Sequence, residues 1–199
     1  MELSRKIAIS VAVGVVCSIA VSIISFAITC NGIRQDVLRL HVIAASDSEE
    51  DQSLKLRVRD GVLSAGAEIF DGSVNVENAV EKLTPELERL EHTAENIVKE
   101  NGFDYEVNVT LSREFFATRT YENVTLPAGK YLAVRVVIDE GRGKNWWCVM
   151  FPSLCLPAAA VKTEIDDVLN EKEVQLVSRN PKYEPRFKIV EIIEKYFIS

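Results

Sequence analysis

An apolar run near the N-terminus is the longest hydrophobic pattern in the chain. Residues 7–29 contain no charged side chain, and Arg5 and Lys6 stand immediately before them. About 20 apolar residues cross a bilayer as a helix, and the core helices of soluble proteins seldom run this long without a polar face. Residues 1–30 are therefore predicted to form a signal anchor or signal peptide, with a cytoplasmic N-terminus by the positive-inside tendency.

Two interpretations of this segment stay open. The run is longer than the roughly 7–15 residues usual for the apolar part of a signal peptide, which favours an uncleaved anchor. Ser25-Phe26-Ala27, however, has the small-x-small spacing of a cleavage site. Under either interpretation, residues 31–199 form a single domain outside the cytoplasm.

Alternation of residue type predicts the first strand at residues 37–43. One face of this strand is apolar and consists of Leu38, Leu40 and Val42, while the other carries Val37, Arg39, His41 and Ile43. The acidic residues 47–51 then suit the start of a helix, which Ser46, Asp47 or Ser48 can cap.

Two helical regions are marked by apolar residues at spacings of three and four. The first carries Leu54, Val58, Val62, Ala65 and Ile69, and the second, which begins near Asn75, carries Val76, Val80, Leu83, Leu87, Leu90, Ala94 and Ile97. Thr84-Pro85-Glu86 interrupts the second region with a helix-start pattern, so that either the helix kinks there or two helices meet.

Strands dominate the next part of the chain. They are expected at residues 105–111, 113–121, 131–139 and 146–151, with turns at 126–130 and 140–145; helices follow at 163–176 and 187–197, with a loop at 180–185 between them. This order predicts an α+β fold in which helices cover one face of an antiparallel sheet, preceded by the N-terminal transmembrane or signal helix.

Composition agrees with one domain that has a proper core, since 47% of the 199 residues are hydrophobic and 27% are charged. The formal net charge is −7, and the only charges before residue 30 are Glu2, Arg5 and Lys6. Removing their net +1 leaves −8 on the exported part. Because nucleic-acid binding depends on Lys and Arg, nucleic acid is not expected as a partner.

The four cysteines predict a disulfide and no metal site. Cys17 lies within the apolar run and Cys30 just after it, which leaves Cys148 and Cys155 as a close pair. In an exported domain such a pair is more often a disulfide than a metal site, and a zinc ion would need two further ligands. Neither histidine, His41 or His92, has ligand-like spacing to this pair, so no metal or cofactor is expected.

The segment that contains the two tryptophans and the preceding glycines has more than one possible function. Gly141-Arg142-Gly143-Lys144 resembles a phosphate-binding loop, but no Ser or Thr follows the lysine, and a hairpin turn fits better. Neighbouring residues of a strand point to opposite faces, so Trp146 and Trp147 cannot share one environment. Either both pack in core layers, or one of them lies in an interface with a partner, where tryptophan is a common hot spot.

Two segments resemble the signatures of a known family, stage II sporulation protein R. The first signature is R39-L-H-V-I-A-A-S-D-S-E-E-D-Q-S-L-K-L-R-V-R-D60. The second combines L126-P-A-G-K-Y131 with E140-G-R-G-K-N-W-W-C-V-M-F-P-S-L-C155, and F116-A-T-R-T-Y121 fits between the two. His41, Ala45, Asp139 and Ser153 depart from the expected residues, and the segment after Leu156 resembles the family only loosely.

The resemblance implies a signalling protein with no chemistry of its own. Family members are exported from the forespore to the space between the two membranes, where they remain anchored or are released. There they activate a membrane-embedded aspartic protease of the mother cell, which removes the pro-sequence of sigma factor E. Asp47 and Asp51 at the helix start, and Trp146 and Trp147 in the hairpin, are the candidate partner contacts.

The alternative function is a cell-envelope hydrolase that uses Cys148 as its nucleophile. Such an enzyme requires a histidine base beside the cysteine. The sequence places His41 on a strand and His92 on the polar flank of a helix, and neither position suggests that role. The acidic residues 47–51 likewise lack the glycine and the distal glutamate of a calcium loop.

Overall fold

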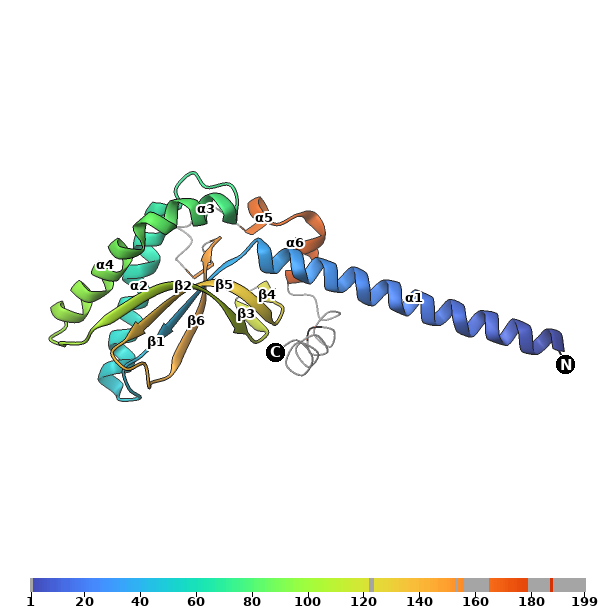
Figure 1. Cartoon of the computed structure of the whole chain (residues 1–199), viewed down its shortest axis with the longest axis horizontal. Coiled ribbons are helices and arrows are strands. Elements are labelled where there is room, and N and C mark those ends of the chain that lie inside the picture. Colours follow the sequence, from blue (N-terminus) through green and yellow to red (C-terminus); the bar gives the residue numbers. More distant parts are fainter. Residues whose placement is uncertain (1, 122–123, 153, 156–164, 179–186, 188–199) are drawn as a thin grey trace.

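The computed structural model describes residues 2–121, 124–152, 154–155, 165–178 and 187. A long N-terminal helix leads into an α+β domain, and helices cover one face of its sheet, as predicted (Figure 1). The elements are α1 (Glu2–Gln35), β1 (Leu38–Ile43), α2 (Glu49–Ile69), α3 (Val76–Leu83), the 3₁₀ turn η1 (Thr84–Glu86), α4 (Leu87–Glu100), β2 (Val107–Phe116), β3 (Arg119–Tyr121), β4 (Val124–Leu126), β5 (Gly129–Ile138), β6 (Asn145–Phe151), α5 (Ile165–Val168) and α6 (Glu171–Val177).

The main sheet has the strand order β2-β5-β1-β6. β2 with β5 and β1 with β6 are antiparallel pairs, whereas β1 and β5 run parallel. The sheet is therefore mixed, where a wholly antiparallel one was expected. The parallel pair arises because α2, α3, η1, α4 and β2 to β4 separate β1 from β5 along the chain, which leaves room for a crossover connection.

The apolar face of the sheet, called the helix face below, packs against α2 and α4. Leu38, Leu40 and Val42 lie on it and are fully buried, as the alternation predicts. α2 and α4 contribute to the same core Leu54, Val58, Val62, Leu90, Ala94 and Val98. Each buried Leu or Val adds about 1.5–3 kcal/mol of transfer free energy, so this layer is the main source of stability.

Local sequence signals set the helix boundaries. Ser48 caps α2 by accepting a hydrogen bond from the backbone N–H of Asp51, and Asn75 caps α3 in the same way through Asn78. The predicted interruption at Thr84-Pro85-Glu86 is the turn η1, so two helices meet there.

One expected strand boundary is wrong. Two strands were expected at residues 105–111 and 113–121, but β2 runs unbroken from Val107 to Phe116 and pairs with β5 along its whole length. The polar Ser112 does not end the strand, because its side chain faces the side of the sheet opposite the helices. β3 follows separately and pairs only with β4.

The opposite side of the sheet, called the second face below, holds a smaller core that includes the end of α1. Cys30 and Ile33 of α1 are fully buried there, together with Val37, Phe116, Leu126, Tyr131, Ala133, Val149, Leu169, Leu176, Val177 and Phe187. The Arg34 guanidinium donates two hydrogen bonds to the carbonyl oxygen of Ala128, at 3.0 and 2.6 Å. The last turns of α1 thus belong structurally to the domain.

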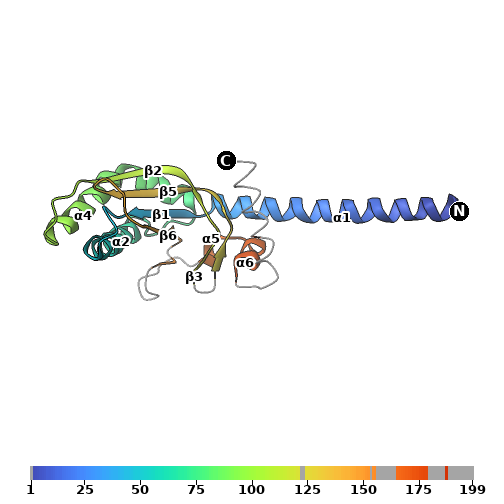
Figure 2. The ribbon, with the colours of Figure 1, turned by 90° about the horizontal axis from the view of Figure 1, so that it is seen from below.

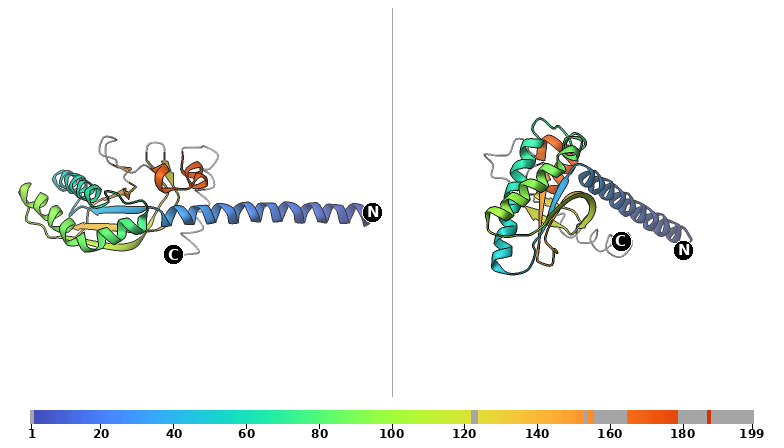
Figure 3. Two further views of the ribbon diagram at one scale, coloured as in Figure 1. Left: turned by 90° about the horizontal axis from the view of Figure 1, so that it is seen from above. Right: turned by 60° about the vertical axis from the view of Figure 1, so that its left-hand side comes forward.

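α1 is 34 residues long, and in the described part of the chain it is the one helix apolar and long enough to cross a membrane. It extends away from the domain as a straight rod in every view (Figures 2 and 3). Only two residues separate its end at Gln35 from the start of β1 at Leu38, so no linker intervenes.

The helix expected at residues 163–176 is divided into α5 and α6. The division falls before Asn170, whose side chain accepts hydrogen bonds from the N–H groups of Lys172 and Glu173 and caps α6. The loop expected at 180–185 and the helix expected at 187–197 lie outside the described residues, apart from Phe187. The ring of Phe187 contacts that of Phe26 on α1, with centroids 5.8 Å apart.

Candidate functional site

The two signature segments meet at the end of the sheet away from α1. The loop of residues 44–47 follows β1, and the turn of residues 140–144 joins β5 to β6. The expected hairpin is not formed, because β1 lies between β5 and β6 in the sheet and pairs with both. Gly143 N–H donates to Ala44 O at 2.9 Å, and Arg142 N–H donates to Ala45 O at 3.2 Å. We call this pair of connected loops the loop junction.

Side chains from the segment just before α2 and from its first two turns tighten the loop junction. Lys144 N–H donates to the Asp47 carboxylate at 2.7 Å, and the buried ammonium of Lys55 donates to Lys144 O at 3.0 Å and to Gln52 Oε1 at 2.6 Å. Burial lowers the pKa of Lys55, and the nearby Asp47 carboxylate opposes that shift. These hydrogen bonds hold the two loops in one arrangement.

Asp51 and Asp47 have different environments. The Asp51 carboxylate is 5% exposed and accepts a hydrogen bond from Ser46 Oγ at 2.5 Å, while its backbone N–H donates to Ser48 Oγ at 3.1 Å. Asp47 lies exposed on the surface. Asp51 therefore fixes the conformation of the loop, whereas the side chain of Asp47 is accessible to a partner.

A glycine is required where the two loops touch. A Cβ atom at position 143 would collide with the backbone carbonyl of Ser46, which cannot move without breaking the loop junction. Close approach of two backbones is a common reason for glycine. The second glycine of the apparent phosphate loop thus has a packing role.

The two tryptophans point to opposite faces of β6. Trp146 is 36% exposed, and the guanidinium of Arg59 on α2 lies 4.4 Å from its ring centroid. Trp147 lies half-buried on the second face, stacked on the His41 ring at a centroid distance of 3.7 Å. Trp147 also makes an edge contact with Phe116, with centroids 4.8 Å apart.

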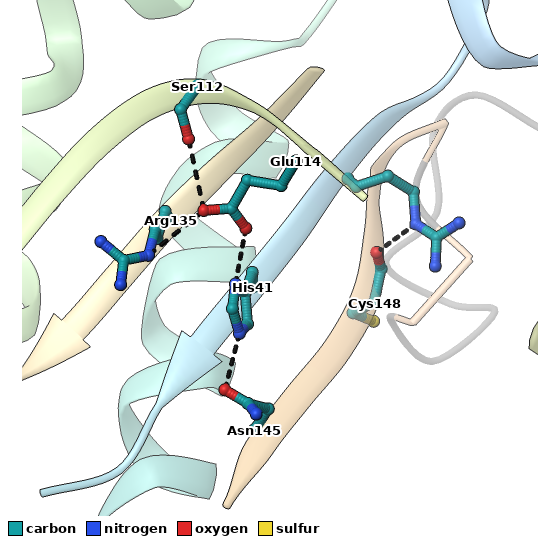
Figure 4. A network of polar contacts seen from close by, with 7 residues as sticks. His41, Ser112, Glu114, Arg135, Asn145 and Cys148 are labelled. Carbon is teal, nitrogen blue, oxygen red and sulfur yellow. Dashed lines mark hydrogen bonds and ion pairs between the residues drawn. The ribbon is translucent and has the colours of Figure 1, made fainter. Parts of the chain in front are cut away.

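A polar network crosses the second face (Figure 4). It includes His41, on which Trp147 stacks. His41 Nδ1 lies 2.6 Å from Glu114 Oε2, and His41 Nε2 lies 2.8 Å from Asn145 Oδ1. Glu114 Oε1 is 3.2 Å from Arg135 Nε and accepts a longer hydrogen bond from Ser112 Oγ at 3.4 Å. One carboxylate therefore joins β2, β5 and β1, and the imidazole extends the connection to β6.

Sequence reasoning missed this network, because its members come from four strands whose order cannot be read locally. The signal that could have found it is the pair Arg39 and His41 on a strand otherwise made of aliphatic residues. All described hydrogen bonds of the His41 ring go to Glu114 and Asn145, so no nucleophile is joined to it there. The network ties the four strands together and supports Trp147.

Cys148 and Cys155 form the expected disulfide, with their Cα atoms 6.4 Å apart. Cys148 is fully buried and packs on the helix face, whereas His41 lies on the second face. A Cys148–His41 dyad is therefore not formed, which removes the geometric basis for the hydrolase alternative. Within the described residues there is also no cluster of three or more His, Cys, Asp or Glu side chains suited to a metal ion.

Comparison with known proteins agrees with the resemblance of the signatures. Residues 34–180 match the family model described as stage II sporulation protein R. A curated relative, stage II sporulation protein R of Bacillus subtilis (strain 168), is 31% identical over 149 residues, which are 73% of this chain and 66%, slightly under two thirds, of that protein. No solved structure matched the chain. The matched segment contains the sheet, α2 to α4 and the loop junction, and the chain belongs to the stage II sporulation protein R family.

Proposed function

We propose that this chain is an exported signal of sporulation that activates a membrane-embedded aspartic protease of the mother cell. The protease then removes the pro-sequence of sigma factor E. Family membership supports the role in sporulation, and the apolar helix α1 and the disulfide are compatible with a protein that acts outside the cytoplasm. In this proposal α1 contacts the forespore membrane, and the domain acts in the space between the two membranes, either anchored or released.

The observation that carries the proposal is the position of α1 and the loop junction relative to each other. Two residues separate the end of α1 from the start of β1, and the loop junction follows at the other end of β1, where Asn145 pairs with Ile43. The anchor and the loop junction therefore lie at opposite ends of the domain (Figure 2). A domain held by α1 would present Asp47 and Trp146 away from its own membrane and toward the facing one.

The proposed contact surface consists of Asp47 and Trp146, supported from behind by Asp51 and Trp147. A ligand shifts its partner only if it binds the active state better than the inactive state. A surface fixed by hydrogen bonds between two loops loses little conformational entropy on binding, so more of the contact energy remains available for that shift.

The function is tested by supplying the chain, fused to an efficient export signal, to cells that express the protease and pro-sigma E without other sporulation proteins. We expect cleavage of pro-sigma E that depends on both the chain and the protease. If the exported, folded chain leaves pro-sigma E uncleaved, the proposal is wrong.

Trp146→Ala is expected to reduce that cleavage by about tenfold or more, because loss of a tryptophan hot spot typically costs 2 kcal/mol or more of binding. Stability should fall only moderately, since Trp146 is 36% exposed and the Arg59 guanidinium covers its ring, so cleavage is compared at equal amounts of folded protein. Phe115→Ala is the matched control: Phe115 is aromatic and similarly exposed, at 39%, but lies on β2. Equal cleavage by the two variants would exclude Trp146 from the contact surface.

A further inference from the structure

Arg39 is a fully buried cation on the second face, and its acceptors in the described part of the chain are uncharged. Its side chain is 0% exposed. Nε donates to the carbonyl oxygen of Cys148 at 2.9 Å, and Nη2 donates to the Tyr121 hydroxyl at 2.6 Å. Nη1 has no hydrogen-bond acceptor among the described residues, and no ion pair joins the guanidinium to a described carboxylate.

Aromatic rings take the place of a counter-ion. The guanidinium carbon lies 4.3 Å from the centroid of Phe116, 4.9 Å from that of Tyr131 and 5.4 Å from that of Tyr121. Desolvation lowers the pKa of Arg39, and Tyr121 and Tyr131 oppose the shift. Cation–π contacts offset only part of the penalty for a buried charge, so an apolar side chain of similar volume would serve stability at least as well.

The unused part of the guanidinium is the part that binds carboxylates. Nη1 and Nη2 form a planar fork that matches the two oxygens of a carboxylate. Among the residues that the structure describes, Nη1 has no acceptor, and Nη2 donates to the phenol oxygen of Tyr121, which itself donates to Trp147 O at 3.3 Å. Tyr121 belongs to the small β3–β4 sheet, outside the main sheet, so it can move without breaking a strand of the core.

One further cation near this position favours an anionic ligand, although the chain as a whole is acidic. Arg119 precedes Tyr121 on β3 and is exposed, and its charge acts on Arg39. Arg135 is 40% exposed and is oriented through its Nε by Glu114. Arg135 is thus already paired with a carboxylate, and the buried Arg39 and the exposed Arg119 are the two guanidinium groups that favour an anion at the aromatic lining.

We propose that Arg39 is the receptor for a carboxylate of the partner protein. An acidic side chain of the partner displaces the Tyr121 hydroxyl from Nη2 and binds Nη1 and Nη2 together. This rests on the proposed function, in that the partner is the protease which the chain activates. It gives that protease a second contact besides the loop junction, and it explains why a costly buried cation is present.

The site can be tested without the partner by using formate as the probe. In thermal unfolding of the full-length protein in detergent, replacing chloride by formate at constant ionic strength should raise the wild-type midpoint by about 2–4 °C, as for a weak ligand of the native state. Arg39→Met should unfold at the same temperature as wild type or higher, and should show no formate response. Arg57→Met, which removes an exposed guanidinium on α2, should respond like wild type.

Tyr121→Phe provides a second variant that keeps the test decisive if Arg39→Met does not fold. Loss of the hydroxyl leaves Nη2 without its acceptor, so the midpoint in chloride should fall, while the formate response should exceed that of wild type. A purely structural Arg39 predicts the same small formate effect in all variants, and that result would overturn the proposal.

The cell assay then separates this inference from the proposed function. Folded Arg39→Met should fail to trigger cleavage of pro-sigma E, whereas Arg57→Met should trigger it normally. Full activity of Arg39→Met would refute the carboxylate receptor and leave the proposed function intact. If wild type itself triggers no cleavage but responds to formate through Arg39, the protease is the wrong partner and the carboxylate site stands.

Discussion

Gly143→Ala is expected to lower the free energy of unfolding by about 2–4 kcal/mol and to abolish cleavage of pro-sigma E. The new methyl group would collide with the Ser46 carbonyl, so the two loops must separate. That separation breaks the backbone hydrogen bonds from Gly143 to Ala44 and from Arg142 to Ala45. Urea unfolding of the full-length protein measures the first effect, and the cell assay measures the second.

Arg142→Ala is the control for this substitution, because the Arg142 side chain is 75% exposed and its backbone N–H is retained. The free energy of unfolding of Arg142→Ala should lie within about 0.5 kcal/mol of the wild-type value. A Gly143→Ala protein that unfolds at the wild-type urea concentration and still activates would show that the loop junction is neither tight nor needed.

Replacing Cys148 and Cys155 together by alanine is the second change with a large expected effect. The bridge closes a loop of residues separated by 7 positions, and chain-entropy arguments assign about 2.5 kcal/mol to a loop of this size. Alanine is preferable to serine because Cys148 is fully buried and a hydroxyl there would lack a partner. The urea midpoint of the double variant should fall accordingly. Reduction of the wild-type protein should lower its urea midpoint by the same amount.

The single variants separate a structural bridge from a nucleophile. Cys155→Ala and Cys148→Ala should destabilise the protein to a similar extent, since each removes the same bond, and each should activate in proportion to its folded fraction. A folded Cys148→Ala protein that is inactive while Cys155→Ala is fully active would instead restore the hydrolase interpretation.

Periodicity alone predicted the helix face correctly. Leu38, Leu40 and Val42 alternate on β1, and α2 and α4 repeat their apolar residues every three or four positions, so each element shows which side it buries. The parallel pairing of β1 with β5 was not predictable in this way. Alternation tells which residues share a face, but it carries no information about which strand lies next.

The second face shows the same limit at the level of the site. His41 looked unremarkable on its strand, and Glu114 and Arg135 belong to strands far from it in the sequence. Only the register Thr110–Arg135–His41–Trp147 across four strands brings the network together. The loop junction was predicted in part, because both of its segments were chosen from the sequence as candidate contacts. That the two segments contact each other could not be predicted, because it depends on the order of the strands in the sheet.

The position of β1 in the sheet also has a kinetic consequence. Its neighbours in the sheet are β5 and β6, where Arg39 pairs with Ala133 and with Val149, about a hundred residues further along the chain. During synthesis from the N-terminus, β1 is therefore complete long before β5 and β6 have been made. Contacts between residues so far apart in the sequence also form slowly. The sheet therefore cannot close on either side of β1 until β5 and β6 have been synthesised.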